Sequence, residues 1–247
     1  MSPAVRAALP PRLLEPEPAR VAEMFSVLAP AYDRFNRLSS LGLDGRWRKR
    51  AAAHVRPGEA VLDLGCGTGD LALAAARRAG PAGRVDGADF SAPMLDLARV
   101  KAGAAGPGGA PVAFHHASAD ALPFPDAAFD IVVSAFVLRS LARIRRAAAA
   151  ELRRVLRPGG RAALLELTRP GFLPLRWAHR AWLGMGLPLV GRLAAGPRWP
   201  GAYLADTILA FPEPSEYAGW FTSEGLECDS IRPISGGIAC LIVLRRP

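Results

Sequence analysis

The sequence predicts an α/β fold with a doubly wound, mostly parallel sheet, and three observations support this prediction. Short apolar segments alternate with helical segments between residues 60 and 167, a glycine-rich turn follows the first apolar segment, and an acidic residue ends the second. Such alternation favours a parallel sheet with helices on both faces. The length of 247 residues suits one domain of this kind with additions.

Two segments precede this alternation. Residues 1–20 mix proline, arginine, glutamate and small apolar residues, which predicts a flexible tail. Residues 21–50 place apolar side chains at helical spacing, which predicts a helical arm that bends at Pro30. We expect residues 21–247 to form a single domain that begins with this arm.

The alternating part supplies five strands and three helices. Each strand is a short apolar run, and glycine or proline marks several of the connections. The expected strands are residues 60–64, 84–89, 112–116, 130–135 and 161–167, and the expected helices are residues 70–78, 93–101 and 143–156.

The C-terminal third changes character before the sheet resumes. Residues 172–211 are apolar, carry tryptophans and are interrupted by glycine and proline, so we interpret them as an inserted helical lid. A helix at residues 213–224 and strands at residues 227–234 and 238–245 follow, with a tight hairpin turn between the strands. The expected sheet therefore has seven strands, with an antiparallel hairpin strand at its C-terminal end.

The composition limits the functional classes. The net charge is +9, and Lys49 and Lys101 are the only lysines among 31 basic residues. This positive charge suits binding to nucleic acid, to an anionic membrane surface or to an acidic substrate. A coding bias toward GC-rich codons gives the same arginine-rich composition. The three cysteines lack the spacing of a zinc site or a disulfide framework, so we expect no metal and a reducing cytosol. We recognise neither a signal peptide nor a membrane-spanning stretch.

The glycine-rich turn at residues 61–70, VLDLGCGTGD, is the main candidate for a ligand site. Gly65, Gly67 and Gly69 lie between a strand and a helix, where absent side chains let the backbone approach a ligand and present N–H groups at a helix N-terminus. The GxGxG spacing after Asp63 differs from the dinucleotide fingerprint GxGxxG. The turn predicts a nucleotide-type site, with a plain tight turn as the alternative.

Residues at the ends of the next strands extend this site. Asp89 ends the second strand, where a carboxylate accepts hydrogen bonds from ribose hydroxyls in this architecture. Asp120 lies among small residues after the third strand and is a candidate for an adenine amino group. Because ligands of open α/β sheets bind at the carboxyl ends of strands, we expect Gly67, Asp89, Asp120 and Ala135 along one crevice. Asp130 opens the fourth strand, and we expect it to be structural.

Segments throughout the chain resemble the class I methyltransferases, and within them the C-methyltransferases of ubiquinone and menaquinone biosynthesis. The resemblance implies a Rossmann-like fold, S-adenosylmethionine as cofactor and a lipophilic prenylated quinol as methyl acceptor. This acceptor is most of all demethylmenaquinol, with the ubiquinone-pathway benzoquinol as the alternative. Its segments are FSVLAPAYD at residues 25–33, VLDLGCGTGDL at 61–71, ALPFPD at 121–126 with FD at 129–130, FVLR at 136–139, RVLRPGG at 154–160, YL at 203–204 with Ile208, and GGI at 236–238.

The resemblance also implies roles for single residues. Thr68 and Asp89 would contact the methionine and ribose portions of the cofactor, while Arg139 and Tyr32 would face the quinol. The full set of expected cofactor-binding residues is Asp63, Gly65, Gly67, Thr68, Gly69, Asp89, Ser118, Ala119, Asp120 and Ala135.

Three departures from the family pattern lie beside the expected acceptor pocket. The usual FGLRN is FVLRS at residues 136–140, Ala135 replaces a cofactor-lining serine, and Ile242 stands where a histidine is usual. The sequence therefore specifies the cofactor more closely than the acceptor.

Methyl transfer from a sulfonium is an in-line displacement, so the protein must position two partners and make the acceptor carbon nucleophilic. A quinol ring becomes nucleophilic when a hydroxyl proton leaves, and the pKa of a phenol is about 10. Arg139 is the candidate for stabilising the phenolate, and Tyr32 is the candidate for accepting or relaying the proton. The alternatives are a surface ion pair for Arg139 and a packed aromatic for Tyr32. We expect His115 and His116 to be structural.

Residues 172–192 interleave tryptophans and aliphatic side chains with arginines. This pattern suits a lid over a polyprenyl tail and a peripheral contact with anionic lipid headgroups on the inner, cytoplasmic face of a membrane. The alternative is a helix that packs on the core and exposes a solvated basic face. The sequence is compatible with a homodimer as well as with a monomer.

Other functional classes fit less well. An NAD-dependent oxidoreductase is disfavoured because the glycine spacing is different and no Tyr-x-x-x-Lys occurs. A basic RNA-binding or scaffold protein would use the arginine-rich residues 143–157, but no aromatic stacking motif accompanies them, so we expect no nucleic-acid partner. A methyltransferase of a small phenolic metabolite keeps the same chemistry and changes the acceptor.

Overall fold

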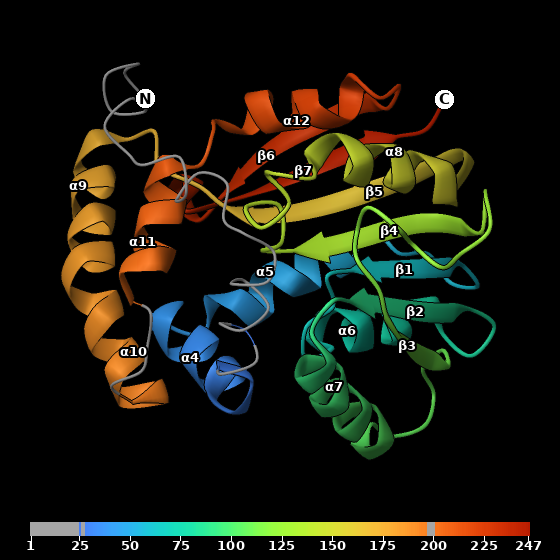
Figure 1. Cartoon of the computed structure of the whole chain (residues 1–247), viewed down its shortest axis with the longest axis horizontal. Helices are drawn as coiled ribbons and strands as arrows, with labels where there is room; N and C mark the ends of the chain where they lie inside the picture. The colour runs from blue at the N-terminus through green and yellow to red at the C-terminus, as the bar shows by residue number, and fades with distance from the viewer. Residues whose placement is uncertain (1–24, 26–27, 197–200) are drawn as a thin grey trace.

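A seven-stranded sheet forms the centre of the computed structural model, which describes Phe25, residues 28–196 and residues 201–247 (Figure 1). The strands are β1 (Ala60–Leu64), β2 (Arg84–Asp89), β3 (Val112–His116), β4 (Phe129–Ala135), β5 (Leu156–Leu167), β6 (Glu227–Ile234) and β7 (Ala239–Arg245). Their order is β3-β2-β1-β4-β5-β7-β6. The first five strands pair in parallel, and β7 runs antiparallel to both β5 and β6. The expected doubly wound sheet with a C-terminal hairpin strand is confirmed.

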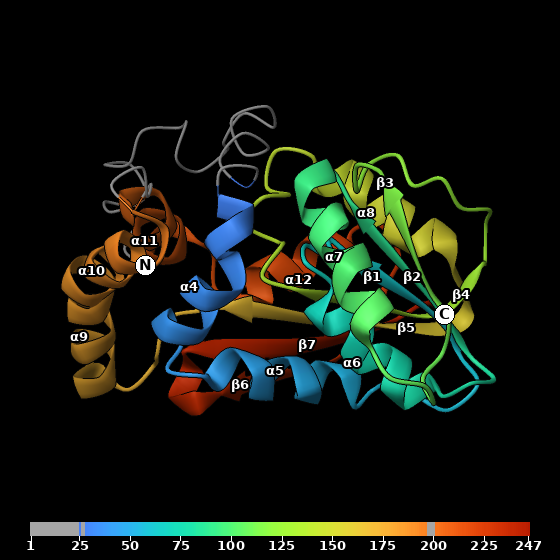
Figure 2. The same ribbon diagram turned by 90° about the horizontal axis from the view of Figure 1, so that it is seen from below.

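The central strands are apolar on both faces because helices cover both. Every residue of β1 is buried, and β1 lies between β2 and β4. The helices α5 (Leu43–Ala52) and α6 (Asp70–Ala79) pack on one face, where Trp47 and Leu71 belong to one apolar cluster. The helices α8 (Arg145–Val155) and α12 (Pro214–Thr222) pack on the other face, where Leu152 and Tyr217 belong to a second cluster (Figure 2). The helix α7 (Ala92–Ala104) lies against β2 and β3.

Two local features differ from the expected boundaries. The helix α7 continues to Ala104, three residues beyond the expected end at residue 101. The strand β5 begins at Leu156, five residues before the expected start, but its pairing with β4 skips residues 157–160 and resumes at Arg161, so a turn interrupts the strand. Gly159 in this turn has φ +76°, a conformation that favours glycine.

The N-terminal arm is broken twice. It comprises η1 (Ala29–Ala31), α4 (Tyr32–Ser39) and then α5. The break near Pro30 agrees with the expected bend, whereas the break between α4 and α5, where Leu41 and Gly42 have positive φ, was not expected. The expected flexible tail, residues 1–20, and most of residues 21–27 lie outside the described residues.

Four helical segments lie beyond one end of the sheet, beside α4 (Figure 1). They are α9 (Leu173–Ala181), η2 (Trp182–Gly186), α10 (Leu187–Ala195) and α11 (Gly201–Ala210). Phe35 of α4 packs with Leu183, Leu187 and Ile208 in a third apolar cluster, separate from the two clusters on the sheet. These four segments therefore form a small helical layer that packs against α4, and we call them the end helices.

Candidate active site

The glycine-rich turn between β1 and α6 is held in a conformation that excludes larger residues. Gly65 has φ +68°, and a Cβ atom there would lie 2.4 Å from Cγ2 of Val137. Gly67 has φ +52°, and its backbone N–H donates a hydrogen bond of 2.8 Å to Oδ2 of Asp89. The turn therefore keeps its backbone close to the carboxyl end of β2, as the sequence indicated.

Asp89 connects two loops at the end of β2. Its Oδ1 accepts a hydrogen bond of 2.9 Å from the backbone N–H of Ser91, while its Oδ2 accepts the hydrogen bond from Gly67. Burial raises the pKa of the carboxyl group, and the backbone hydrogen bonds oppose this shift. Each carboxylate oxygen keeps a second acceptor position, so Asp89 is able to bind hydroxyl groups as well.

A cavity of about 420 Å³, which we call the glycine-loop cavity, lies along the carboxyl ends of the strands. It brings together seven of the ten residues expected to bind the cofactor: Gly65, Gly67, Asp89, Ser118, Ala119, Asp120 and Ala135. Ser118 donates a hydrogen bond to Asp120 at its rim. The crevice expected from the strand-end rule is therefore present.

Asp63 and Thr68 lie in a niche beside this cavity, and Tyr32, Gly65, Gly67 and Ala135 line both the niche and the cavity. Both carboxylate oxygens of Asp63 are buried and have no hydrogen-bond partner in the described part of the chain. This burial raises the pKa of Asp63 to about 8. The Thr68 hydroxyl instead donates to Asp33, at 2.6 Å.

Gly69 differs from the other expected residues because it does not line the glycine-loop cavity or the niche. It precedes the first residue of α6 and has φ +84°. A Cβ atom at this position would lie 3.1 Å from Cβ of Ala98 and 3.2 Å from Phe114. In the structure, Gly69 thus allows α6 to begin and α7 to pack closely.

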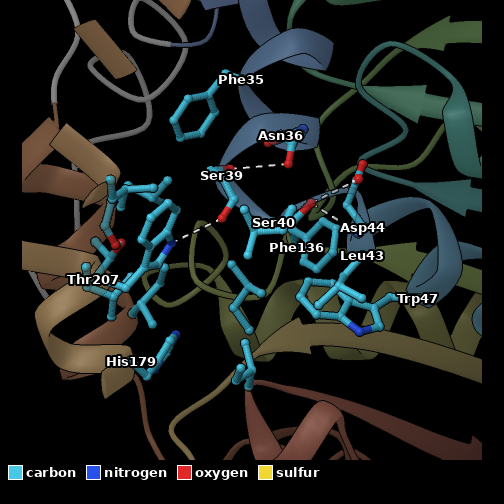
Figure 3. Close-up of a pocket in the computed structure, with 18 of the residues that line it drawn as sticks. Phe35, Asn36, Ser39, Ser40, Leu43, Asp44, Trp47, Phe136, His179 and Thr207 are labelled. Carbon is cyan, nitrogen blue, oxygen red and sulfur yellow. Dashed lines mark hydrogen bonds between the residues drawn. The ribbon is translucent and has the colours of Figure 1, made fainter. Parts of the chain in front are cut away.

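A second cavity, of about 360 Å³, lies between the sheet and the end helices, and we call it the helical cavity (Figure 3). Its wall is mostly apolar, with Phe35 from α4, Trp47 from α5 and Phe136 after β4. His179 of α9 and Thr207 of α11 contribute polar groups from the side of the end helices. The residues that line both this cavity and the glycine-loop cavity are Phe25, Tyr32, Phe136 and Ser140.

Tyr32 lies where the two cavities meet. It lines both of them as well as the niche, and its Cε1 atom is 3.9 Å from where a Cβ of Gly67 would be. Burial raises the pKa of its phenol, and the positive charge of Arg48 and a hydrogen bond with Asn36 oppose this shift. The Tyr32 hydroxyl therefore stays protonated near neutral pH.

Arg139 lines the helical cavity and forms an ion pair with Glu166 at the end of β5. The Arg139 side chain is 10% exposed and the Glu166 side chain is 0% exposed. Oε1 of Glu166 also accepts a hydrogen bond of 2.8 Å from the backbone N–H of Leu167. Burial raises the pKa of Glu166, and Arg139 lowers it. Because both side chains are almost fully buried, this ion pair is not the surface ion pair that was the alternative for Arg139.

Several residues of the site were missed from the sequence. Glu166 lies one residue before the end of β5, so the strand-end rule places it at the same edge of the sheet but does not identify Arg139 as its partner. Phe136 follows β4 with φ +66°, and the guanidinium of Arg48 lies 5.1 Å from its ring centroid. Arg48 in turn forms an ion pair with Asp44, one helical turn earlier in α5. No local pattern brings Arg48 from the arm to Phe136, because their contact is tertiary.

The residues that we expected to be structural make contacts between neighbouring segments. Oδ2 of Asp130 accepts a hydrogen bond of 2.8 Å from the backbone N–H of Ala60, and its other oxygen pairs with Arg157. His115 contacts Asp86 at 2.8 Å, and His116 contacts the backbone carbonyl of Phe90 at 2.8 Å. All three side chains tie neighbouring segments together.

Solved structures with this fold include proteins of different activity. The chain resembles the [4+2]-cyclase SpnF with a TM-score of 0.64 and 20% identity, covering 95% of this chain and 97% of that one. It resembles a SAM-dependent methyltransferase from Aquifex aeolicus with a TM-score of 0.59 and 16% identity, covering 100% of both chains. Because one of the two is a cyclase, the fold alone leaves the reaction undetermined.

A family model described as the ubiE/COQ5 methyltransferase family matches residues 14–244. The chain belongs to this family. A demethylmenaquinone methyltransferase from Thermus thermophilus is 42% identical over 228 residues, which cover 91% of this chain and 100% of the relative. A demethylmenaquinone methyltransferase from Deinococcus radiodurans is 41% identical over 221 residues, which cover 89% of each chain.

Membership in the ubiE/COQ5 family confirms that the protein is a methyltransferase whose cofactor is S-adenosylmethionine. It also explains why the two cavities share part of their lining, Tyr32 included, since a methyltransferase must place a methyl donor beside an acceptor. Among the described helices of this ubiE/COQ5 methyltransferase, none is both long enough and apolar enough to cross a bilayer.

Proposed function

We propose that this methyltransferase transfers a methyl group from S-adenosylmethionine to a ring carbon of a lipophilic prenylated quinol, with demethylmenaquinol as the principal acceptor. The observation that carries the proposal is the meeting of the glycine-loop cavity and the apolar helical cavity at Tyr32. The names of the Thermus and Deinococcus relatives support demethylmenaquinol. A relative from Geobacter sulfurreducens, named ubiquinone/menaquinone biosynthesis C-methyltransferase UbiE, adds the ubiquinone-pathway benzoquinol as a second acceptor.

The residues around the glycine-loop cavity fit S-adenosylmethionine. The unpartnered carboxylate of Asp63 suits the ammonium group of the methionine portion, because a buried carboxylate requires a cation or hydrogen-bond donors. The glycine turn leaves space for the backbone to approach the ligand, and Asp89 has acceptor positions left for ribose hydroxyls. Ser118, Ala119 and Asp120 form the rim that we assign to adenine. When bound, S-adenosylmethionine supplies an electrophilic methyl group on a sulfonium.

The residues at the junction prepare the acceptor. Methylation of a ring carbon would form a carbon–carbon bond while the carbon–sulfur bond of the sulfonium breaks, so the products are the methylated quinol, the thioether S-adenosylhomocysteine and one proton. Arg139 is held at the wall of the helical cavity by Glu166, where its guanidinium stabilises a quinol hydroxyl that loses its proton. Tyr32 keeps its own proton near neutral pH, so it acts as a hydrogen-bond donor and relay rather than as a phenolate base.

The end helices cover the rest of the acceptor. The wall of the helical cavity on this side is mostly apolar, as a prenyl tail requires, with His179 and Thr207 as its polar groups. Trp182 joins these helices to the arm, because its indole N–H donates a hydrogen bond of 3.1 Å to the backbone carbonyl of Ser39. Residues 172–211 therefore act as a lid over the tail, and residues 21–50 act as the arm that carries Tyr32.

The outer face of the lid fits a peripheral contact with an anionic membrane surface. Six of its large hydrophobic side chains are at least 60% exposed, and Arg180 and Arg192 lie exposed among them. Such a face suits lipid headgroups at the inner face of a membrane, from which the quinol would enter. The six side chains are Phe172, Leu173, Trp177, Met185, Leu189 and Leu193.

Incubation with S-adenosylmethionine and reduced demethylmenaquinone tests the proposal, with mass spectrometry to detect one added methyl group. The ubiquinone-pathway benzoquinol and a small phenol without a tail run in parallel. We expect the prenylated quinols to be methylated and the small phenol to react poorly. Methylation of the small phenol alone would show that the acceptor assignment is wrong, and absence of S-adenosylmethionine binding in calorimetry would overturn the site.

A further inference from the structure

Lys101 of α7 has three oxygen partners that belong to three different segments. Its Nζ atom lies 2.5 Å from Oδ2 of Asp33 in α4, 2.7 Å from Oδ1 of Asp70 at the start of α6, and 2.9 Å from Oγ1 of Thr68 in the glycine turn. An ammonium group has three N–H donors and no acceptor, so these partners use all of its donors.

The four side chains form a closed network. The Thr68 hydroxyl accepts from Lys101 and donates to Oδ1 of Asp33, at 2.6 Å. Asp33 thus receives one hydrogen bond on each carboxylate oxygen. The side chains of Lys101, Asp33 and Asp70 are only 28%, 39% and 39% exposed, so water replaces these bonds less readily than at an open surface.

The network joins the arm to the glycine turn next to Tyr32. Asp33 follows Tyr32 in the first turn of α4, so whatever fixes the Asp33 carboxylate also fixes the backbone that carries the Tyr32 ring. Without the ammonium, the carboxylates of Asp33 and Asp70 would face each other across Thr68 with no counter-ion in this cluster. Loss of Lys101 would therefore turn an attraction between arm and turn into a repulsion.

We propose that Lys101 is a positioning residue that fastens the N-terminal arm to the glycine turn through Asp33, Thr68 and Asp70, and thereby holds Tyr32 at the junction of the two cavities. The inference rests on the proposed function only in its kinetic test, which measures methylation of the quinol. The attachment of the arm is a property of the protein without any substrate.

The chemistry of the side chain explains why this position holds a lysine in a chain whose other basic residues are nearly all arginine. A guanidinium is planar and directs its donors outward in a fixed fork, whereas an ammonium directs three donors from one atom. Three oxygens within 2.9 Å of a single nitrogen suit only the ammonium. Lys101→Arg is therefore expected to restore the charge but not the network.

Reactivity of the two lysines gives a test that needs no methyl acceptor. Limited acetylation of the full-length protein, followed by peptide mass spectrometry, compares Lys101 with Lys49, which is exposed on α5. We expect Lys49 to react at least about 10-fold faster, and Asp33→Asn to accelerate the acetylation of Lys101 without changing that of Lys49. Equal reactivity of the two lysines in the unmodified protein would overturn the proposal.

Kinetics separate a positioning role from a general loss of folding. In Lys101→Met we expect kcat to fall by about 10- to 100-fold, because misplacement of a catalytic group has costs of this size. The KM for the quinol should stay within about twofold, and Lys101→Arg should recover less than about half of the loss. Lys49→Met is the matched control and should behave as the unmodified protein. Full recovery by Lys101→Arg, or an unchanged kcat in folded Lys101→Met, would contradict the proposal.

The two tests fail for different reasons. If the unmodified protein methylates no quinol, the proposed function is wrong, but the acetylation of Lys101 still reports on the attachment of the arm. If the protein methylates the quinol and Lys101 is unprotected, the proposed function stands and the inference about Lys101 is wrong.

Discussion

The Arg139 guanidinium reaches the wall of the helical cavity while its partner Glu166 lies entirely within the protein. The carboxylate thus has no access to solvent, and Arg139 is its charged partner. A positive group that is fixed before the substrate arrives stabilises a developing negative charge with little reorganisation. The pair therefore places a fixed cation in the wall of the helical cavity, which Tyr32 also lines.

Replacing Arg139 with alanine should lower kcat for the quinol by about 10²- to 10³-fold, as expected for the loss of one group that stabilises a transition-state oxyanion. Binding of S-adenosylhomocysteine should not change, because Arg139 does not line the glycine-loop cavity. Steady-state kinetics and calorimetry measure the two effects. Arg157→Ala, which removes an ion pair with Asp130 far from both cavities, is the control. An Arg139→Ala variant with full turnover would remove Arg139 from the mechanism.

The same variant should lose stability in a pH-dependent way. Burial raises the pKa of Glu166 above its usual value, and Arg139 is the main influence that lowers it. A raised pKa in the folded state means that stability is present at low pH and is lost as the pH rises through that pKa. Removal of Arg139 should therefore cost about 3 kcal/mol at pH 8 and much less at pH 5.

Urea unfolding at the two pH values measures this difference. The double variant Arg139→Ala with Glu166→Gln serves as the control, since glutamine carries no charge that must be buried. Its stability should be nearly the same at both pH values. A single variant that is equally destabilised at pH 5 and pH 8 would show that the carboxylate of Glu166 is not the cause.

Local patterns predicted the sheet and the glycine-loop cavity well. Alternation of apolar runs with helices gave the strands, and the rule that ligands bind at carboxyl ends of strands placed Gly67, Asp89, Asp120 and Ala135 together. The helical cavity was harder to predict because it forms where the arm and the end helices meet after folding. The pairing of Arg139 with Glu166 depends on contacts between segments that are distant in sequence, and so does the φ of +66° at Phe136.

Tyr32→Phe should separate the role of the hydroxyl from that of the ring. Phenylalanine preserves packing against Gly67 but removes the group that we expect to donate to the acceptor, so kcat should fall by about 10²-fold. The KM for S-adenosylmethionine should change little. Tyr217→Phe is the matched control, because Tyr217 is buried in the apolar cluster between the sheet and the helices α8 and α12 and lines neither cavity. Equal activity of the two variants would exclude a catalytic role for the Tyr32 hydroxyl.

Asp63 should couple cofactor binding to proton release. Its pKa is raised to about 8 by burial, so the free protein holds this proton at pH 6 and loses stability as the pH rises from about 4 toward 8. A bound ammonium group would favour the carboxylate and displace the proton. The affinity for S-adenosylhomocysteine should therefore rise with pH, by at most about 10-fold per pH unit, up to about pH 8.

Calorimetry in buffers of different ionisation enthalpy measures the released proton directly. Asp63→Asn should bind S-adenosylhomocysteine more weakly, and its affinity should be nearly constant between pH 6 and pH 8 because the amide does not titrate. The same slope in both proteins would show that another group releases the proton, and that Asp63 does not face the ammonium.

The outer face of the lid should bind anionic membranes through both its apolar and its basic side chains. Trp177 and Leu193 are 69% and 74% exposed, so Trp177→Ser with Leu193→Ser removes apolar contact area without disturbing the core. Co-sedimentation with phosphatidylglycerol vesicles should weaken by about 10-fold in this double variant. Val100→Ser is the matched control, since Val100 is 71% exposed but lies on α7, away from the lid. Binding that survives the double variant, or equal binding to neutral phosphatidylcholine vesicles, would contradict the assignment of this face, because the arginines require anionic headgroups.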